Sequence, residues 1–341
     1  MRPFRQTERP PRLTPILPGL ECRPGRAANK ARAILALAAV GLPALSGCQR
    51  ADDAPTQGPT IALVMKTLNN PFFVEMDRGA KEAAQRLGVH LLVQAPEREV
   101  DVEKQMQIIE DLIQRQVGAI CVTPSGSKEI VPALVKANRA GIPVLVVDTR
   151  VDAATLAAAG GRAVTFIGSD NAEGGRIAGR YLIQRLQAKG KVAILEGIPG
   201  HETGDARMKG FRDAVAQEAG IQIIASQTAN WERDQGYNVF QNILQSHPDL
   251  QGVFACNDLM ALGAVEAIAA AGRTGQIVVV GFDATADARD AIRRGTLAAS
   301  VAQHPEEMGR LAVETALAVI HDQPIPPEIP VKVELITKNN L

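Results

Sequence analysis

The sequence predicts an α/β protein in which two similar, doubly wound parallel sheets form two lobes. Three observations predict this fold class. The chain has 341 residues, a length that suits two domains better than one. Short runs rich in β-branched residues alternate with amphipathic segments, as in parallel sheets that helices cover on both faces. A pattern in the first half also recurs in the second.

The first residues have the features of a secretory signal. Residues 1–32 hold eight basic and two acidic residues, and the apolar stretch Ala33–Gly47 follows them. A basic start, a short apolar core and small residues before a cleavage site define such signals. The end of this stretch, followed by Cys48, looks like a lipobox, in which the cysteine is acylated and becomes the mature N-terminus. A short buried helix with an incidental cysteine is the alternative. We expect a lipoprotein signal peptide over residues 1–47.

Beyond a polar, flexible tether at residues 48–59, strands and helices are expected to alternate. Helical patterns fill most intervals between strands, as at Pro71–Leu87, where the proline suits the first turn. The predicted strands are residues 61–65, 89–93, 119–122, 144–147, 164–167, 192–195, 221–225, 252–255, 277–280, 298–301 and 331–336.

An internal repeat supports the division into two lobes. Arg78-Gly79 and Gly88-Val89 recur as Lys209-Gly210 and Gly220-Ile221, at an offset of 131–132 residues. At an offset of 135, two aspartates follow apolar runs in equivalent places of the halves. Ligands of doubly wound sheets bind outside the carboxyl ends of the strands. If the halves face each other, the carboxylates of these two aspartates, Asp148 and Asp283, point into one cleft.

Composition and motifs argue against several classes of function. After residue 32 the chain carries 29 basic and 35 acidic residues, which disfavours binding to nucleic acid. The five histidines are scattered and no Cys-x-x-Cys occurs, so no metal or cofactor is expected. Cys121 and Cys256 lie in apolar runs of different halves and suit the core better than a disulfide. No phosphate-loop, nucleophile-elbow or zinc-protease motif is present, so an enzyme is not expected.

Aromatic and planar polar residues gather at predicted strand ends. Phe72 and Phe73 follow the first strand, and Trp231, the one tryptophan, follows a strand of the second half. Aromatic faces suit the C–H patches of a sugar ring, while carboxylates, amides and guanidinium groups pair with its hydroxyls. Each polar residue alone could be an N-cap or a surface residue, so their joint placement favours a sugar site. They are Asn70, Asp148, Arg207, Asn257, Asp283 and Gln303.

Seven segments match one family in order: KTLNNPFF, VVDTR, IGSDNAEGGRIAG, EGIPGHETGDARMKGF, CNDLMALGA, VVGFDATADA and VAQHPEEMG. Residues 60–338 thus resemble the periplasmic sugar-binding proteins of ABC importers (ribose/galactose type, type I, cluster B), most closely the ribose and allose binders. Ribose binders carry Arg directly after the aspartate that matches Asp148, whereas Thr149 precedes Arg150 here. Because of this difference, Arg150 is not counted among the expected sugar contacts, and ribose is less favoured as the ligand. The resemblance implies that the sugar contacts Lys66, Asn70, Phe72, Phe73, Asp148, Arg207, Trp231, Asn257, Asp283 and Gln303.

The resemblance also implies a mechanism and partners. Crossings near residues 169–170, 303 and 332 would join an N-terminal lobe (60–169 plus 304–332) to a C-terminal lobe (170–303 plus 333–341). Hinge closure would enclose a monosaccharide, which the protein would deliver to an ABC permease. We expect a monomeric lipoprotein, anchored through Cys48 in the periplasm or on the extracellular face, with no cofactor. The sugar itself stays open among allose, ribose, psicose and a polyol.

Other functions fit parts of the same sequence. A sugar sensor that feeds a chemoreceptor or kinase would differ only in its partner. A lac repressor-type effector domain would share the fold, but a helix-turn-helix should precede it, where this chain has a Pro-rich stretch and an apolar signal. A glycoside hydrolase could use Asp148 and Asp283 as its paired carboxylates.

Overall fold

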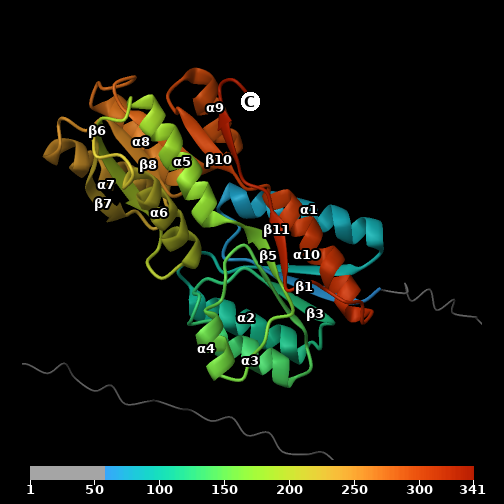
Figure 1. Cartoon of the computed structure of the whole chain (residues 1–341). Coiled ribbons are helices and arrows are strands. Elements are labelled where there is room, and N and C mark those ends of the chain that lie inside the picture. Colours follow the sequence, from blue (N-terminus) through green and yellow to red (C-terminus); the bar gives the residue numbers. More distant parts are fainter. Residues whose placement is uncertain (1–57) are drawn as a thin grey trace, which may run out of the picture. The chain divides into compact units, whose positions relative to one another are not determined.

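The computed structural model describes residues 58–341, which form two lobes, each built around one sheet (Figure 1). In the N-terminal lobe, helices cover both faces of the sheet, and α10 returns late in the chain to pack against α1. The elements of this lobe are β1 (Thr60–Val64), α1 (Pro71–Leu87), β2 (His90–Gln94), α2 (Val102–Gln114), β3 (Ala119–Val122), α3 (Val131–Arg139), β4 (Val144–Val147), α4 (Ala153–Ala158), β5 (Phe166–Ser169), α10 (Pro305–Ile320) and β11 (Glu328–Val331).

The C-terminal lobe repeats this plan with the middle of the chain and its last strand. Its helices α5 and α6 pack against each other, as do α7 and α8. The elements of this lobe are α5 (Asn171–Arg185), β6 (Gly190–Glu196), α6 (Glu202–Val215), β7 (Ile221–Thr228), α7 (Arg233–Ser246), β8 (Gly252–Ala255), α8 (Asp258–Ala270), β9 (Val278–Asp283), α9 (Ala286–Arg294), β10 (Ala299–Ala302) and β12 (Glu334–Thr337).

The two sheets have matching strand orders. The first runs β11-β5-β4-β3-β1-β2 and the second β12-β10-β9-β8-β6-β7. Neighbouring strands are parallel throughout, except that β12 runs antiparallel to β10. The predicted pair of similar, doubly wound sheets is thereby confirmed, with one antiparallel edge strand that the sequence pattern did not indicate.

The chain passes between the sheets three times, after β5, after β10 and between β11 and β12. At the last crossing the prediction of one strand over residues 331–336 is wrong. β11 pairs with β5 in one sheet and β12 pairs with β10 in the other, separated by Lys332-Val333. Alternating apolar residues continue across this junction, so the sequence carries no local sign that the hydrogen-bonding partner changes. The other predicted strands lie within a few residues of the observed ones.

The repeated glycine of the sequence has the same structural role in both lobes. A Cβ atom on Gly79 of α1 would lie 2.0 Å from the carbonyl oxygen of Glu306 in α10. A Cβ atom on Gly210 of α6 would lie 1.9 Å from the carbonyl oxygen of Ala172 in α5. Only glycine therefore lets the backbones of these helix pairs approach so closely. The repeat marks one helix–helix contact in each lobe.

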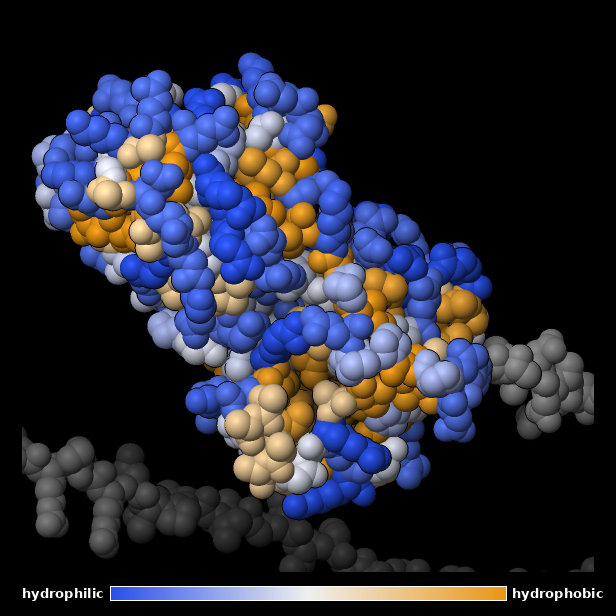
Figure 2. All heavy atoms as spheres, in the orientation of Figure 1, coloured by the Kyte–Doolittle hydropathy of each residue, from blue (hydrophilic) through white to orange (hydrophobic). Residues whose placement is uncertain are grey.

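Apolar side chains fill the layers between sheets and helices, and the surface is mixed. On the face shown in Figure 2, hydrophilic side chains predominate and apolar ones lie between them in smaller groups. Cys121 and Cys256 are buried and free, as predicted, and burial raises the pKa of both thiols to about 12. Among residues 58–341, no helix combines the length and the apolar character needed to cross a membrane. The predicted signal peptide, Cys48 and most of the tether lie outside the described residues.

Candidate functional site

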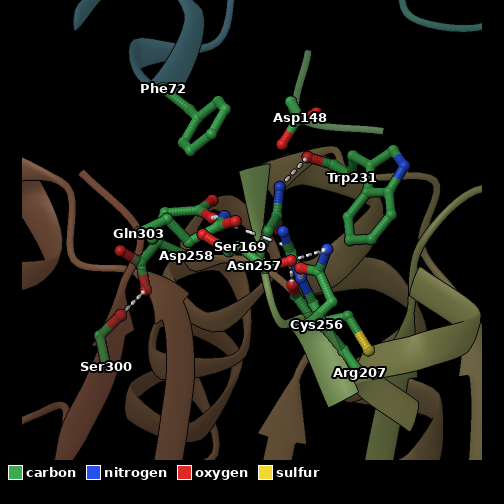
Figure 3. A network of polar contacts seen from close by, with 12 residues as sticks. Phe72, Asp148, Ser169, Arg207, Trp231, Cys256, Asn257, Asp258, Ser300 and Gln303 are labelled. Atoms are coloured by element: carbon green, nitrogen blue, oxygen red, sulfur yellow. Dashed lines mark hydrogen bonds and ion pairs between the residues drawn. The ribbon is translucent and has the colours of Figure 1, made fainter. Parts of the chain in front are cut away.

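One buried cavity between the lobes is lined by all ten of the predicted site residues. The N-terminal lobe supplies residues that follow β1, β2 and β4, and the C-terminal lobe supplies residues that follow β7, β8 and β10 or belong to α6 and β9. Side chains from the two lobes face each other there, as Phe72 and Asp148 do above Asn257 and Gln303 (Figure 3). The lining residues are Lys66, Asn70, Phe72, Phe73, Glu99, Asp148, Thr203, Arg207, Trp231, Asn257, Asp283 and Gln303.

In the N-terminal lobe, a buried ion pair forms one wall of the cavity. Lys66 Nζ lies 3.4 Å from Asp148 Oδ2, and both side chains are less than 5 % exposed. Thr149 Oγ1 also donates a hydrogen bond to the same carboxylate oxygen at 2.9 Å. A buried charge is costly unless it is paired, so each of these two groups stabilises the other. The second carboxylate oxygen, Asp148 Oδ1, takes no part in either contact.

Asn70 is both an N-cap and a lining residue. Its Oδ1 accepts a hydrogen bond from the backbone N–H of Phe72 at 3.0 Å and caps α1. Its Nδ2 donates to Glu99 Oε1, also at 3.0 Å. With the amide oriented at both ends, one N–H of Asn70 stays available to a ligand. Asn257 has the same double role, because it caps α8 through Met260 N.

Glu99 and Thr203 line the cavity although the sequence analysis did not select them. Burial raises the pKa of Glu99, while the charge of Lys66 and the hydrogen bond from Asn70 oppose that rise. Glu99 belongs to the charged segment between β2 and α2, where neither an apolar run nor an aromatic residue marks it. Thr203 is inside a segment that the family resemblance covers, but a threonine in a helix gives no separate sign of a site.

Arg207 is held rigidly at the floor of the cavity. Its Nε donates to Asn171 Oδ1 at 2.9 Å, and its Nη1 donates to the carbonyl oxygen of Cys256 at 2.8 Å. The guanidinium group also lies 3.9 Å from the ring centroid of Phe282. These contacts on two edges and one face fix its plane, so its remaining N–H groups point in set directions.

Asp283 faces Arg207 in a second cluster of buried charges. Gln303 Nε2 donates to Asp283 Oδ1 at 2.7 Å, and Arg207 Nη1 lies 3.7 Å from the same oxygen. Burial raises the pKa of Asp283 well above its usual value, and the Arg207 charge opposes that rise. The Oε1 atom of Gln303 is buried and has no hydrogen-bond partner within residues 58–341. Such an acceptor is available to a hydroxyl group.

Asp258 lies beneath this cluster and supports the end of β9. It accepts hydrogen bonds from Ser300 Oγ at 2.6 Å and from Thr285 N at 2.8 Å. Burial raises the pKa of Asp258 to about 6, against the lowering effect of these hydrogen bonds. Asp258 is not among the lining residues, so its role is to hold the loop that follows Asp283.

The Trp231 ring lines the cavity and packs closely against Gly197. A Cβ atom on Gly197 would lie 1.9 Å from the indole ring, so only glycine leaves room for it. The backbone of Trp231 has φ of +67°, and its carbonyl oxygen accepts a hydrogen bond from Asn257 Nδ2 at 3.1 Å. In the opposite lobe, Phe72 and Phe73 pack edge to face, with ring centroids 5.2 Å apart.

Left-handed backbone conformations cluster at the site. Besides Trp231, Asp148 has φ of +63°, Asp283 has +113° and His304 has +57°. Residues other than glycine adopt such conformations at a cost of about 1–3 kcal/mol each. Because the two equivalent aspartates share this feature, it belongs to the repeated plan of the lobes.

Arg150 does not line the cavity, which agrees with the doubt that Thr149 raised about it. Its guanidinium group pairs with Glu328 at 2.5 Å and lies 3.8 Å from the ring centroid of Phe166. Thr149 instead satisfies Asp148 through its hydroxyl group. The extra polar group that an arginine after the aspartate would bring is therefore absent from this cavity.

The cavity combines acceptors, donors and aromatic faces, and no group of three or more His, Cys, Asp or Glu residues in the described part of the chain is arranged to hold a metal ion. Carboxylates and amides converge from two sides, with the Trp231 ring on one flank and Phe72 on the other. This arrangement can bind a small molecule that carries hydroxyl groups on its edge and C–H groups on its faces.

Comparisons with known proteins agree with this chemistry. A family model described as a periplasmic binding protein domain matches residues 61–324. The chain is 40 % identical to the ribose import binding protein of Escherichia coli (strain K12) over 279 residues, which cover 82 % of this chain and 90 % of that protein. It is 36 % identical to the D-allose-binding periplasmic protein of the same organism over 249 residues, 73 % of this chain and 80 % of that one.

Solved structures show the same fold. A periplasmic solute-binding protein of an ABC transporter from Actinobacillus succinogenes 130z, with bound D-allose, matches with a TM-score of 0.79 and 40 % identity, over 82 % of this chain and 98 % of that one. A solute-binding protein from Agrobacterium vitis with bound α-D-tagatopyranose matches with a TM-score of 0.78 and 32 % identity, over 82 % and 95 %. These relatives are binding proteins of transport systems and not enzymes.

Proposed function

The chain belongs to the periplasmic binding protein family, and from this premise we propose that it captures a ribose- or allose-like monosaccharide for import by an ABC transporter. Relatives named for ribose and for allose, and a similar structure with D-allose bound, support this class of ligand. The observation that carries the proposal is the cavity itself, where the ten residues that the sequence analysis associates with sugar meet.

The buried polar groups provide stereochemical selection. A hydroxyl group in the wrong orientation would leave a buried carboxylate or amide without a partner, at a cost of about 1–3 kcal/mol. Asp148, Asp283 and the Oε1 atom of Gln303 are acceptors of this kind, while Arg207 and Asn70 are donors. Stacking on the aromatic rings adds affinity with little preference between stereoisomers.

Entry of the ligand requires the lobes to separate. The side chains that line the cavity are buried in the closed arrangement, so a monosaccharide cannot reach them from solvent. We therefore propose hinge motion at the three crossings, between an N-terminal lobe of residues 60–169 plus 304–332 and a C-terminal lobe of residues 170–303 plus 333–341.

The finer description of the protein is also a proposal. The basic and apolar pattern before Cys48 supports a lipoprotein that is anchored through this residue and faces the periplasm or the exterior. There a monomer would bind the sugar and present it to the permease of the transporter.

Calorimetric titration of the purified protein with D-allose, D-ribose, D-psicose and a polyol tests the proposal. We expect micromolar or tighter binding of at least one sugar, equivalent to about −8 kcal/mol or better. Asp148→Ala and Asp283→Ala should abolish this binding, because each leaves a buried cation or amide without its acceptor. Asp111→Ala, at an exposed position on α2, is the matched control and should bind as the wild type does.

Circular dichroism would show that both variants are folded. A wild-type protein that binds no monosaccharide, or folded Asp148→Ala and Asp283→Ala variants with full affinity, would contradict the proposed site.

A further inference from the structure

A buried histidine contacts the Trp231 ring from behind. His201 precedes α6 and is only 2 % exposed. The indole Nε1 of Trp231 lies 3.2 Å from His201 Nδ1, and the two ring centroids are 6.4 Å apart. His201 is not one of the residues that line the cavity. Its contact therefore holds the ring that faces the ligand and does not itself reach the ligand.

The same histidine segment touches the opposite lobe. The backbone N–H of Glu202, the residue after His201, donates to Ser127 Oγ at 3.4 Å. Ser127 belongs to the segment between β3 and α3 of the N-terminal lobe. His201 thus lies between a ligand-facing ring of its own lobe and a contact with the other lobe.

The chemistry of the partners determines the protonation state of the imidazole. An indole N–H can only donate, so His201 Nδ1 must accept and carries no proton. The proton of a neutral ring then lies on the other nitrogen, Nε2. A protonated imidazole has two donors and no acceptor, so it would oppose the indole N–H. The contact with Trp231 therefore requires the neutral ring.

We infer that His201 is a positioning residue that couples the seating of Trp231 to the closure of the two lobes. When the lobes close, the ring is shielded from water and stays in the neutral form that accepts from the indole. When they separate, the imidazole becomes accessible to water. This inference rests on the proposed function, because it concerns the same sugar site.

Acid should therefore oppose closure. Burial, aided by the charge of Lys66, lowers the pKa of His201 to about 3 in the closed arrangement, whereas a solvated histidine titrates near 6.5. Below about pH 6.5, His201 is protonated when the lobes are separated and must release its proton before they close. The sugar affinity therefore falls roughly tenfold per pH unit. Lys66, which follows β1, is the charged group that acts on the ring. Arg207 of α6 lies 5.7 Å from the centroid of the Trp231 ring, and Glu202, next to His201, is influenced by Asp148 and Arg150 after β4.

Two substitutions at this position separate positioning from mere packing. His201→Leu fills similar space but offers the indole no acceptor, so the sugar affinity at pH 7.5 should fall about tenfold or more. Sugar binding should also change the fluorescence of Trp231, the one tryptophan of the chain. In His201→Leu this change should become smaller. His201→Gln can accept from the indole but does not titrate, so it should restore most of the affinity.

The decisive measurement is the ratio of wild-type to His201→Gln affinity between pH 7.5 and 5.5. The carboxyl groups of Glu99, Glu202 and Asp283 also titrate late because of burial, and the ratio cancels their common effect. We expect the wild type to lose about tenfold relative to His201→Gln over this range. His321→Gln, at an exposed histidine, is the control and should follow the wild type.

The possible results are distinguishable. A wild-type protein without sugar affinity would overturn the proposed function. Sugar affinity with the same pH profile in the wild type and His201→Gln would overturn the role of His201 alone, as would a folded His201→Leu variant with full affinity at pH 7.5. If His201→Leu does not fold, the pH ratio still decides.

Discussion

Individual buried carboxyl groups set the electrostatic character of the site. Lys66 and Arg207 face Asp148 and Asp283, and Asp258 lies one layer deeper. The buried acids outnumber the buried cations, and burial raises the pKa of several of these acids. Each such group binds its proton more tightly in the folded protein than in the unfolded chain. The free energy of unfolding should therefore fall as the pH rises and these groups lose their protons.

Asp258 offers a direct test of this dependence. Its pKa is raised to about 6 in the folded protein, against about 3.9 in an unfolded chain. Its contribution is therefore fully present below pH 4 and is lost as the pH rises through 6. Urea unfolding at pH 4, 5, 6 and 7 should show the wild type losing roughly 3 kcal/mol relative to Asp258→Asn.

Asp111→Asn, at an exposed position, should show the wild-type dependence on pH. Parallel pH profiles for the wild type and Asp258→Asn would mean that Asp258 is ionised without strain, and the interpretation of its burial would be wrong.

At the level of residues, the ten predicted lining residues were identifiable because they are unusual residue types at strand ends in matched family segments. His201 and Glu99 were not identifiable in this way. Histidine next to a helix start is unremarkable in a sequence, and only the fold brings it to Trp231, thirty positions away. Glu99 belongs to a charged loop whose residues look solvated until the loop is seen to fold over Asn70.

Helix pairs are the elements most sensitive to substitution in this fold. Gly210→Ala should lower the free energy of unfolding by about 1–3 kcal/mol, because the new methyl group meets a backbone carbonyl of α5 that cannot rotate away. Gly79→Ala should act likewise on α1 and α10. Thermal or urea unfolding followed by circular dichroism measures the loss.

Gly252→Ala, in β8, is the control for these helix contacts. Its new Cβ atom would lie 3.3 Å from the ends of the Leu182, Leu186 and Val192 side chains, which can shift slightly, so the loss should be smaller. Equal losses for Gly252→Ala and Gly210→Ala would contradict the distinction between rigid and adaptable neighbours.

The strands were predictable because apolar runs bounded by helical patterns are buried on both faces. Their exact ends were less so, because hydrogen bonds to neighbouring strands extend β6, β7 and β9 past the apolar core of each run. The single strand expected over residues 331–336 failed for a different reason. Its two halves belong to different sheets, and side-chain alternation does not record which sheet a strand joins.

For the whole molecule, a bound ligand should act as a bridge between the two lobes. A sugar at one hundred times its Kd stabilises the native state by about 2.7 kcal/mol. The melting temperature measured with the best sugar of the panel should therefore be several degrees higher than without it. Asp283→Ala should show no such rise. A shift of equal size in Asp283→Ala would place the binding outside the cavity.

The antiparallel edge strand has a practical consequence for protein engineering. β12 covers the outer side of β10, whose four residues are buried. Shortening or replacing Glu334–Thr337 would bare a row of unpaired amide and carbonyl groups on an apolar strand. Such an open border recruits strands from other molecules. Fusion partners and purification tags should consequently be joined through a spacer that leaves this short ribbon intact, or the product will tend to precipitate.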